Sequence, residues 1–220
     1  GNSEALNIKV ANLSLGGTGV IPALNSAIHN SVGKGVTYTV AAGNNGTDIA
    51  GAIPANHPEV VTVTAMSDND GKAGGTGGSP TCTSGESDDK YATFSNYATS
   101  AADQNHTIAA PGVCIRSDWK GGGYNTISGT SMAAPHVAGA FALLRERATG
   151  ASVKTVLDAL RSTGKRVTDY RNSRITTPRI DVKAALDSFG IDDGKLPITL
   201  TLAGNGRGTV TFTPAGSAAS

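Results

Sequence analysis

The sequence predicts an α/β fold in which a mostly parallel sheet is covered by helices on both faces. Apolar segments of strand length recur along the chain, at residues 8–15, 36–42, 59–65 and 106–112. Segments with the apolar spacing of a helix lie between or after them, and strands that alternate with helices favour a parallel sheet that is buried on both sides. With 220 residues, the chain is long enough for a domain with a substantial core.

The first strand leads through a glycine-rich turn into a predicted helix. Pro22 suits the first turn of a helix, and Gly33 and Gly35 suit its end. Between them, apolar residues fall at helical spacing, at Leu24, Ala27 and Ile28. The strand-turn-helix order that an α/β fold requires is therefore present at the start of the chain.

A long loop precedes the helices that are predicted in the second half of the chain. Residues 67–90 are rich in Gly, Ser and Asp and show no periodicity, so we expect a long surface loop there. A helix from Ser131 onward is followed by amphipathic segments at 151–164 and 180–190. The tail alternates apolar residues with threonine around Asn205 and Gly206, which predicts a C-terminal β-hairpin. We therefore divide the chain into a domain at 1–189 and a β-rich extension at 190–220.

Charge and hydropathy exclude two classes of partner. Lys and Arg total 18 and Asp and Glu total 17, so the net charge of +1 provides no field for binding nucleic acid. No apolar run approaches the roughly 18 residues that a membrane span needs. The N-terminal residues show no signal-peptide pattern, so export cannot be inferred from this end.

The chain contains two cysteines, Cys82 and Cys114. They lie too far apart for a paired-cysteine metal site, and the chain has no His-Glu-x-x-His pattern, so metal-centred chemistry is disfavoured. Both lie beside loop-forming residues. A single disulfide in an exported protein and two unrelated buried thiols remain the two interpretations, of which we favour the disulfide.

The segment GTSMAAPHVAG at 129–139 joins a polar loop to a helix of small and apolar residues. Pro135 is tolerated only in the first helical turn, so the helix is expected to begin no earlier than about Ser131. Ser131 would then lie at the positive end of the helix dipole, where free N–H groups stabilise an oxyanion. A plain N-cap serine is the alternative, and it would be favoured for an isolated Gly-x-Ser.

The segment VAAGNNG at 40–46 places a carboxamide, that of Asn44, directly after a buried strand. Ligand sites of open α/β sheets gather at the carboxyl ends of such strands. Asn44 could donate its side-chain N–H to a developing oxyanion, although Asn-Asn-Gly taken alone is ordinary turn chemistry. The order of the two segments, with VANLSLGG at 10–17 ahead of them, decides between these alternatives.

Together these motifs resemble those of the subtilisin-like serine proteases. GTSMAAPHVAG is similar to the nucleophile motif of that family, VAAGNNG to its oxyanion-hole strand and VANLSLGG to its substrate-binding strand. ATFSNY at 92–97 and IAAPGVCI at 108–115 also fall at the family's expected places, and the resemblance covers residues 7–188. It implies a subtilisin-like fold and a serine endopeptidase that acts on proteins or peptides.

The resemblance also implies roles for individual residues. Ser131 would be the nucleophile, and Asn44 would donate to the oxyanion together with the Ser131 N–H. In subtilisin, losing such an Asn costs about 10²–10³ in turnover. An extended substrate would pair with the chain at Ser14, Leu15 and Gly16.

The specificity pocket of the family would be formed by three further residues. Ala42 and Gly43 would form one wall of this pocket, and Ala52 would lie near its floor. No charged residue is expected in the pocket. The resemblance therefore implies a preference for large apolar side chains.

The general base and its orienting carboxylate are missing from the chain. The family carries them upstream, in Asp-Thr/Ser-Gly and His-Gly-Thr motifs, and neither motif occurs here. His136 is placed about 140° around the helix from Ser131, His29 lies on a polar helix face, and His57 and His106 are expected to be exposed loop residues.

The chain is therefore predicted to be the C-terminal portion of a subtilase catalytic domain, N-terminally incomplete. Removing the base costs about 2 × 10⁶ in turnover in subtilisin, so these residues alone should be nearly inactive. The partner they require is an upstream segment of the same precursor that carries the Asp and His. With the predicted disulfide, the resemblance implies a secreted protein.

Two segments resemble cation sites only in part. In some family members a cation is held by carbonyls equivalent to those of Ala55, His57 and Val60, but the usual carboxylate is replaced by Thr107. Residues 68–71, Asp-Asn-Asp-Gly, resemble half of a calcium loop, yet Ser79 stands where the closing Glu belongs. We predict no metal ligands and no cofactor for the chemistry, and leave structural calcium open.

Three other functions fit the sequence less well than a serine protease does. A dinucleotide turn would need glycine at Pro22, and an α/β-hydrolase elbow would need glycine at Ala133. An inactive subtilase-like pseudoenzyme or binding scaffold is the stronger alternative. The presence of both Ser131 and Asn44 argues against it, because a scaffold needs neither.

Overall fold

The computed structural model describes residues 5–169, 171 and 175–190. Its centre is a four-stranded sheet with the order β1-β3-β5-β6, in which all neighbours are parallel. The four strands are β1 (Val10–Leu13), β3 (Thr37–Ala41), β5 (Val61–Met66) and β6 (Thr107–Pro111). Each of the four strands coincides with a segment that the sequence predicted as a strand, although β5 ends at Met66, one residue beyond the predicted 59–65. This part of the prediction is therefore confirmed.

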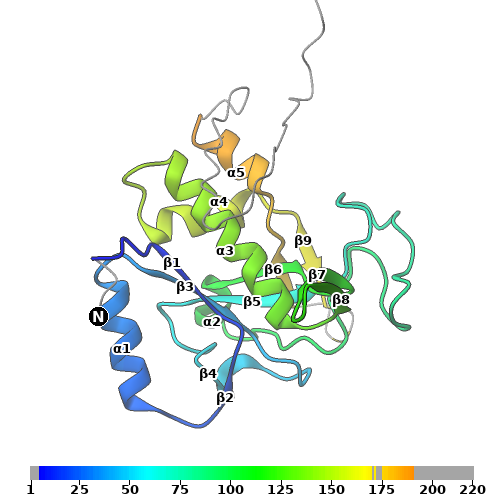
Figure 1. Ribbon diagram of the computed structural model, residues 1–220, viewed down its shortest axis with the longest axis horizontal. Helices are drawn as coiled ribbons and strands as arrows, with labels where there is room; N and C mark the ends of the chain where they lie inside the picture. The colour runs from blue at the N-terminus through cyan, green and yellow to red at the C-terminus, as the bar shows by residue number, and fades with distance from the viewer. Residues whose placement is uncertain (1–4, 170, 172–174, 191–220) are drawn as a thin grey trace, which may run out of the picture.

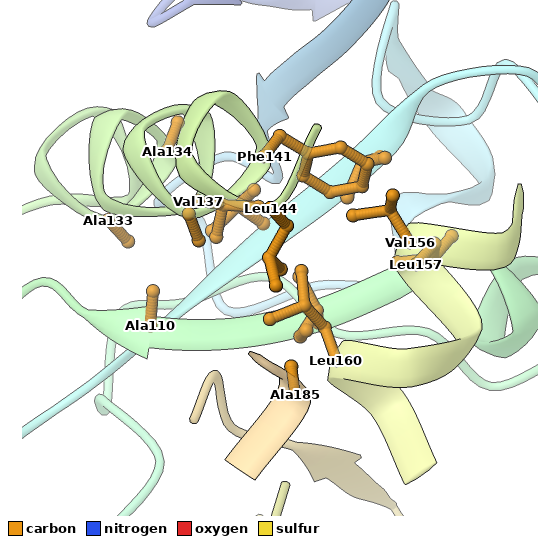
Figure 2. Packing of buried hydrophobic residues seen from close by; sticks show 14 of the residues in the cluster. Ala110, Ala133, Ala134, Val137, Phe141, Leu144, Val156, Leu157, Leu160 and Ala185 are labelled. Atoms are coloured by element: carbon orange, nitrogen blue, oxygen red, sulfur yellow. The ribbon is translucent and has the colours of Figure 1, made fainter. Parts of the chain in front are cut away.

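One face of the sheet is covered by α3 (Thr130–Arg147), which contacts all four strands (Figure 1). Two further helices, α4 (Val153–Thr163) and α5 (Val182–Ser188), pack beside it. Phe141 and Leu144 of α3 lie opposite Val156 and Leu160 of α4 in a fully buried cluster (Figure 2). This cluster is the main core, and it fixes α3 on the sheet.

The other face of the sheet is covered by α1 (Pro22–Val32). Its Ile28 belongs to a second cluster with Val40 of β3, whereas the next residue, Ala41, belongs to the cluster under α3. Because successive strand residues point to opposite faces, the two clusters lie on opposite sides of the sheet. The predicted α/β class, with helices on both faces, is therefore confirmed.

The remaining elements are short, and most were not predicted. They are β2 (Gly17–Thr18), η1 (Ile49–Gly51), β4 (Ala52–Ile53), α2 (Ala101–Asn105), β7 (Ile115–Trp119), β8 (Gly123–Ile127), β9 (Arg166–Thr168) and β10 (Thr176–Pro178). They form three antiparallel pairs, β2 with β4, β7 with β8 and β9 with β10. The hairpin of β7 and β8 leads directly into the turn before α3.

The position of Pro135 differs from the prediction. Pro135 lies in the second turn of α3, because the helix already begins at Thr130. Proline at this position cannot donate to the carbonyl of Ser131, four residues earlier. That carbonyl instead accepts a hydrogen bond of 2.7 Å from the Ser14 hydroxyl. The expectation that Pro135 lies in the first helical turn was wrong, because the Ser14 hydroxyl, just after β1, binds the carbonyl that the proline leaves without its helical donor. The expected start near Ser131 is one residue from the observed start at Thr130.

The predicted loop and disulfide are both present. Residues 67–90 form no helix or strand. Cys82 in this loop is bonded to Cys114 at the start of the β7–β8 hairpin, with the two Cα atoms 5.8 Å apart. The disulfide therefore ties the loop to the segment that precedes α3.

The extension predicted at 190–220, with its hairpin around Asn205, lies outside the described residues except for Gly190. Among the helices of the described part of the chain, none combines the length and the apolarity needed to cross a bilayer.

Candidate active site

A cavity of about 440 Å³ opens where β1 and β3 end and α3 begins. Its lining includes the predicted site residues Leu15, Gly16, Ala42, Gly43, Asn44, Ala52 and Ser131. These residues come from four separate parts of the chain, and the fold brings them to one opening. Ser14 does not line the cavity but touches Ser131 through hydrogen bonds.

Ser131 is the second residue of α3 and is half-buried. The Ser131 hydroxyl donates to the Ser14 carbonyl over 3.4 Å, and the Ser14 hydroxyl donates to the Ser131 carbonyl over 2.7 Å. Ser131 is thus held between the end of β1 and the start of α3. Its hydroxyl lies at the N-terminus of the helix, as the sequence predicted.

The side chain of Asn44 is oriented by Thr130, the residue before Ser131. Its Oδ1 accepts from both the backbone N–H and the hydroxyl of Thr130, each at 2.9 Å. The same hydroxyl accepts from the Gly43 N–H at 3.1 Å. Since Oδ1 is occupied by these two donors, the Nδ2 group is the end of the carboxamide left to bind a ligand. Thr130 was not predicted as a site residue, although it lies within the GTSMAAPHVAG segment.

Two donors at this point have no partner in the part of the chain that the structure describes. Within the described residues, neither the Ser131 N–H nor the Asn44 Nδ2 donates a hydrogen bond. Both groups belong to residues that line the same cavity. An unpaired N–H at a helix N-terminus beside an unpaired carboxamide N–H is an arrangement that can bind a developing oxyanion.

The wall of the cavity opposite α3 is formed by the β2–β4 pair. Gly17 lies opposite Ile53 and Thr18 opposite Ala52, so the segment at 14–16, which the resemblance assigns to substrate binding, is continued by a short ladder. Gly16 lies so close to this ladder that a Cβ would stand 3.2 Å from the Ile53 carbonyl oxygen. A side chain here would force the ladder to shift by a few tenths of an ångström, so the close approach favours a glycine at this position.

The expectation of an uncharged pocket was wrong in one respect, because Asp48 also lines the cavity. Its carboxylate accepts from the Ala50 N–H at 2.8 Å and from the Thr99 hydroxyl. Neither Ala50 nor Thr99 lines the cavity. The carboxylate is therefore engaged by the loop that it caps, and the rest of the lining is uncharged.

Four histidines lie in the described residues, and none of them lines this cavity. His29 is exposed and pairs with Glu59 at 2.7 Å, and the exposed His136 contacts the Met132 carbonyl through its Nδ1. The prediction that His57 and His106 are exposed was wrong, since they are only 8% and 6% exposed. Both lie at the amino-terminal end of β5 and β6. His57 accepts a hydrogen bond from the Val60 N–H, and His106 contacts the Thr62 hydroxyl, so the sheet shields them from solvent.

Burial lowers the pKa of the His106 imidazole, although the nearby Asp103 carboxylate, 3.6 Å away, opposes this effect. Its Nδ1 lies 3.2 Å from the Thr62 hydroxyl, which itself donates to the Ala55 carbonyl at 2.5 Å. Because the Thr62 proton is used in that bond, Nδ1 must be the donor to Thr62. His106 thus lies at the amino-terminal end of β6 and does not line the cavity that holds Ser131.

The two partial cation motifs have different surroundings. At the first, the carbonyls of Ala55 and His57 already accept from the Thr62 hydroxyl and the Val60 N–H. At the second, carboxylate oxygens of Asp68, Asp70 and Asp88 lie within 4.8 Å of one another. Asp88 was not part of the predicted motif, and its oxygens accept from backbone N–H groups of Asn69 and Gly77.

The chain is similar to several known proteins. The sequence matches the subtilase family over residues 2–191. It is 38% identical over 212 residues to alkaline serine exoprotease A of Vibrio alginolyticus, covering 92% of this chain and 35% of that protein. It is 43% identical over 135 residues to alkaline serine protease ver112 of Corniculantispora psalliotae, covering 61% and 29%. The chain thus spans about a third of the length of these curated relatives.

Solved structures show the same likeness. A cold-adapted subtilisin-like serine proteinase matches with a TM-score of 0.60 and 35% identity over 77% of this chain and 53% of that chain. The prenylagaramide maturation protease PagA matches with a TM-score of 0.68 and 25% identity over 87% of this chain and 65% of that chain.

Proposed function

Because this chain belongs to the subtilase family of serine proteases, we propose that it supplies the nucleophile, the oxyanion hole and the specificity pocket of a serine endopeptidase. The observation that carries this proposal is that Ser131 and Asn44 line one cavity, each with a donor that has no partner among residues 5–169, 171 and 175–190. Proteins or peptides are the proposed substrates.

In the proposed reaction, the Ser131 hydroxyl attacks the scissile carbonyl carbon and transfers its proton to a general base. The carbonyl oxygen becomes an oxyanion that accepts from the Asn44 Nδ2 and the Ser131 N–H. Collapse of the intermediate breaks the C–N bond, and the amine leaves with the proton returned by the base. Water then releases the acyl group by the same steps in reverse.

The base and its orienting carboxylate are proposed to come from a segment upstream of Gly1, because no described histidine lies at Ser131. The described chain alone is therefore expected to be inactive. Reading the coding sequence upstream for Asp-Thr/Ser-Gly and His-Gly-Thr motifs tests this directly. If both motifs are absent, the pseudoenzyme or scaffold interpretation replaces ours.

A fluorophosphonate probe tests the chemistry in the protein that carries its upstream segment. We expect Ser131 to be labelled, Ser131→Ala to abolish labelling and Asn44→Leu to slow it by about 10²–10³. Rapid labelling of any other serine, with Ser131 unmodified, would refute the assignment of the nucleophile.

The specificity pocket is proposed to favour large apolar side chains. Ala41, Ala42 and Gly43 form much of its wall, and the Asp48 carboxylate is held by donors outside the cavity. Peptide substrates with Phe or Leu before the scissile bond should be cleaved faster than matched peptides with Lys or Arg. A preference for the basic peptides would show that Asp48 faces the substrate.

We propose that the Ala55–Val60 bend does not depend on calcium, since protein donors occupy two of the three carbonyls that would hold the ion, those of Ala55 and His57. Addition of a chelator should then leave the melting temperature unchanged. A large decrease would point instead to a bound cation, for which Asp68, Asp70 and Asp88 supply the nearest set of carboxylates.

Secretion is proposed from the disulfide and from the name of the Vibrio relative, an exoprotease. Detection of the protein in the culture medium of its source organism would test this.

A further inference from the structure

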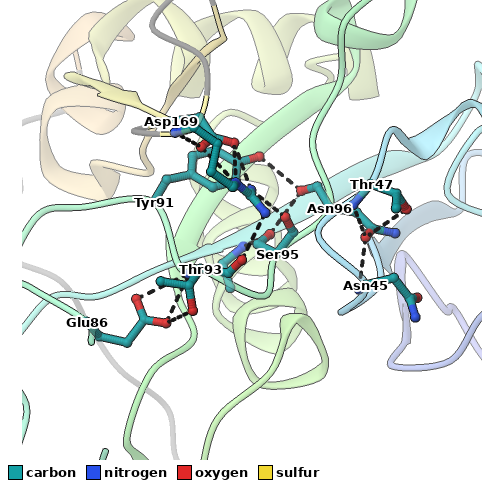
Figure 3. A network of polar contacts seen from close by, with 10 residues as sticks. Asn45, Thr47, Glu86, Tyr91, Thr93, Ser95, Asn96 and Asp169 are labelled. Carbon is teal, nitrogen blue, oxygen red and sulfur yellow. Dashed lines mark hydrogen bonds and ion pairs between the residues drawn. The ribbon is translucent and has the colours of Figure 1, made fainter. Parts of the chain in front are cut away.

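Asn96 makes several hydrogen bonds to the loop at residues 42–47, which carries Asn44 (Figure 3). Its Oδ1 accepts from the backbone N–H of Asn45 at 3.0 Å and of Thr47 at 3.1 Å. Its Nδ2 donates to the Ala42 carbonyl at 2.9 Å, and its backbone N–H donates to the Gly43 carbonyl at 2.9 Å. The loop is thus bonded to Asn96 on both sides of Asn44.

These partners require a carboxamide. An acceptor must face two N–H groups while a donor faces a carbonyl, and among short side chains only that of Asn offers both from one planar group. Asn96 is 3% exposed, so water cannot replace these bonds. Losing the side chain would leave polar groups of Ala42 and Asn45 without partners inside the protein, which is costly.

Gly43 shows how closely the two segments approach. Its φ of +104° lies in a region that side chains avoid, and a Cβ there would stand 2.4 Å from the Asn96 Nδ2. The loop therefore reaches its shape through a glycine that makes room for Asn96. Moving Asn96 would free the wall of the pocket that Gly43 forms.

The segment that carries Asn96 is itself anchored from behind. The Tyr91 hydroxyl donates to the Asn96 carbonyl at 3.0 Å, and Arg171 donates to the Ser95 carbonyl at 2.8 Å. Arg171 also pairs with the fully buried Asp169 at 2.7 Å. Asn96 is thus a fixed point against which the loop is held.

From this geometry we infer that Asn96 is a positioning residue for the oxyanion hole and the specificity pocket. It acts through the backbone of residues 42–47 and does not itself touch the reacting atoms. This inference rests on the proposed function of Ser131 and Asn44. Its consequence is that one buried side chain sets both turnover and substrate binding.

The first test does not depend on activity. Amide hydrogen exchange is measured on a peptide covering residues 43–48, in the protein with its upstream segment, for wild type, Asn96→Ala and the control Thr93→Val. Thr93 lies on the same segment, and its hydroxyl bonds to Glu86 and not to the loop. We expect Asn96→Ala to accelerate exchange at Asn45 and Thr47 by about tenfold, the equivalent of one hydrogen bond, with β5 and β6 still protected. Equal protection in all three proteins would overturn the inference.

The second test separates this inference from the proposed function. If wild type is labelled at Ser131, Asn96→Ala should lower kcat and raise KM, with a combined loss in kcat/KM of about 10- to 100-fold. The control Thr93→Val should stay within about twofold of the wild-type kcat/KM, as expected of a surface substitution. Unlabelled wild type would refute the proposed function and leave the exchange result to judge Asn96. Wild-type kinetics in a folded Asn96→Ala would refute the positioning role alone.

If Asn96→Ala does not fold, Asn96→Asp supplies the test, because it has nearly the same size. It keeps the acceptor for Asn45 and Thr47 but places a second oxygen against the Ala42 carbonyl. We expect protection at Asn45 and Thr47 to remain while kcat/KM falls. Unchanged kcat/KM in this variant would count against the inference.

Discussion

Thr130→Val tests whether the oxyanion hole depends on how Asn44 is oriented. The substitution keeps the Asn44 side chain but removes a bond that orients it. Valine fills nearly the same volume as threonine, and Thr130 is fully buried, so packing is largely preserved. The substitution removes one of the two bonds to Asn44 Oδ1, at 2.9 Å, and the acceptor for the Gly43 N–H, at 3.1 Å. The Asn44 carboxamide would remain but keep a single anchor, the Thr130 backbone N–H.

The size of the effect follows from these bonds. Leaving the Gly43 N–H without a buried partner should lower the free energy of unfolding by about 1–3 kcal/mol. Complete loss of an oxyanion-hole donor costs about 10²–10³ in turnover. Because Asn44 keeps one of its two anchors, we expect about a tenfold loss in kcat, the lower part of what misplacement can cost, with little change in KM.

Steady-state kinetics on an apolar peptide substrate, with the upstream segment present, would measure this loss. Thr130→Ser is the matched control, since it restores the hydroxyl and should recover most of kcat. Equal kcat for Thr130→Val and wild type would show that Asn44 does not need its second anchor. A loss that appears only in KM would show that Thr130 acts on the pocket wall instead.

Three further predictions concern stability. The lowered pKa of His106 means that the unfolded chain binds this proton more readily, so the free energy of unfolding should fall as pH drops below about 6.5, the usual histidine pKa. His106→Asn should reduce this pH dependence in chemical denaturation, and a slope equal to that of wild type would refute it. Reducing the Cys82–Cys114 disulfide, which closes a separation of 32 residues, should cost about 3–4 kcal/mol in denaturant titrations, whereas an unchanged midpoint would show that the loop adds nothing to stability. Phe141→Ala should cost about 3–5 kcal/mol, because the ring is fully buried against α4 (Figure 2), and a smaller loss would indicate that the core can collapse into the space.

The parts of the fold that the sequence predicted are those with strong hydrophobic patterns. The strands of the central sheet are rich in apolar and β-branched residues because both of their faces are covered, as Val40 and Ala41 illustrate. The β7–β8 hairpin was missed because its residues are mostly exposed and it contains three consecutive glycines, Gly121 to Gly123, in place of an apolar alternation. Its pairing depends on backbone hydrogen bonds and on the turn, which leave little trace in composition.

The sequence predicted the site residues that lie in recognisable motifs. Ser131 and Asn44 stand in segments whose residue order is informative by itself. Asn96 and Asp48 were missed because their roles arise from tertiary contacts, across 54 positions for the Asn96 bond to Ala42. The exposure of His57 and His106 was misjudged for the same reason, since a loop position in the sequence does not reveal which side of the sheet it faces.

Pro135 shows how one departure from local regularity can hold distant parts of the site together. In a regular helix, the N–H four residues after Ser131 would bond to its carbonyl, and proline has no such N–H. The carbonyl therefore remains available to the hydroxyl of Ser14, which lies 117 positions away at the end of β1. In return, the Ser14 carbonyl accepts from the Ser131 hydroxyl. The residue that breaks the helix ladder thus leaves a bond through which Ser14 and Ser131 fix each other's position.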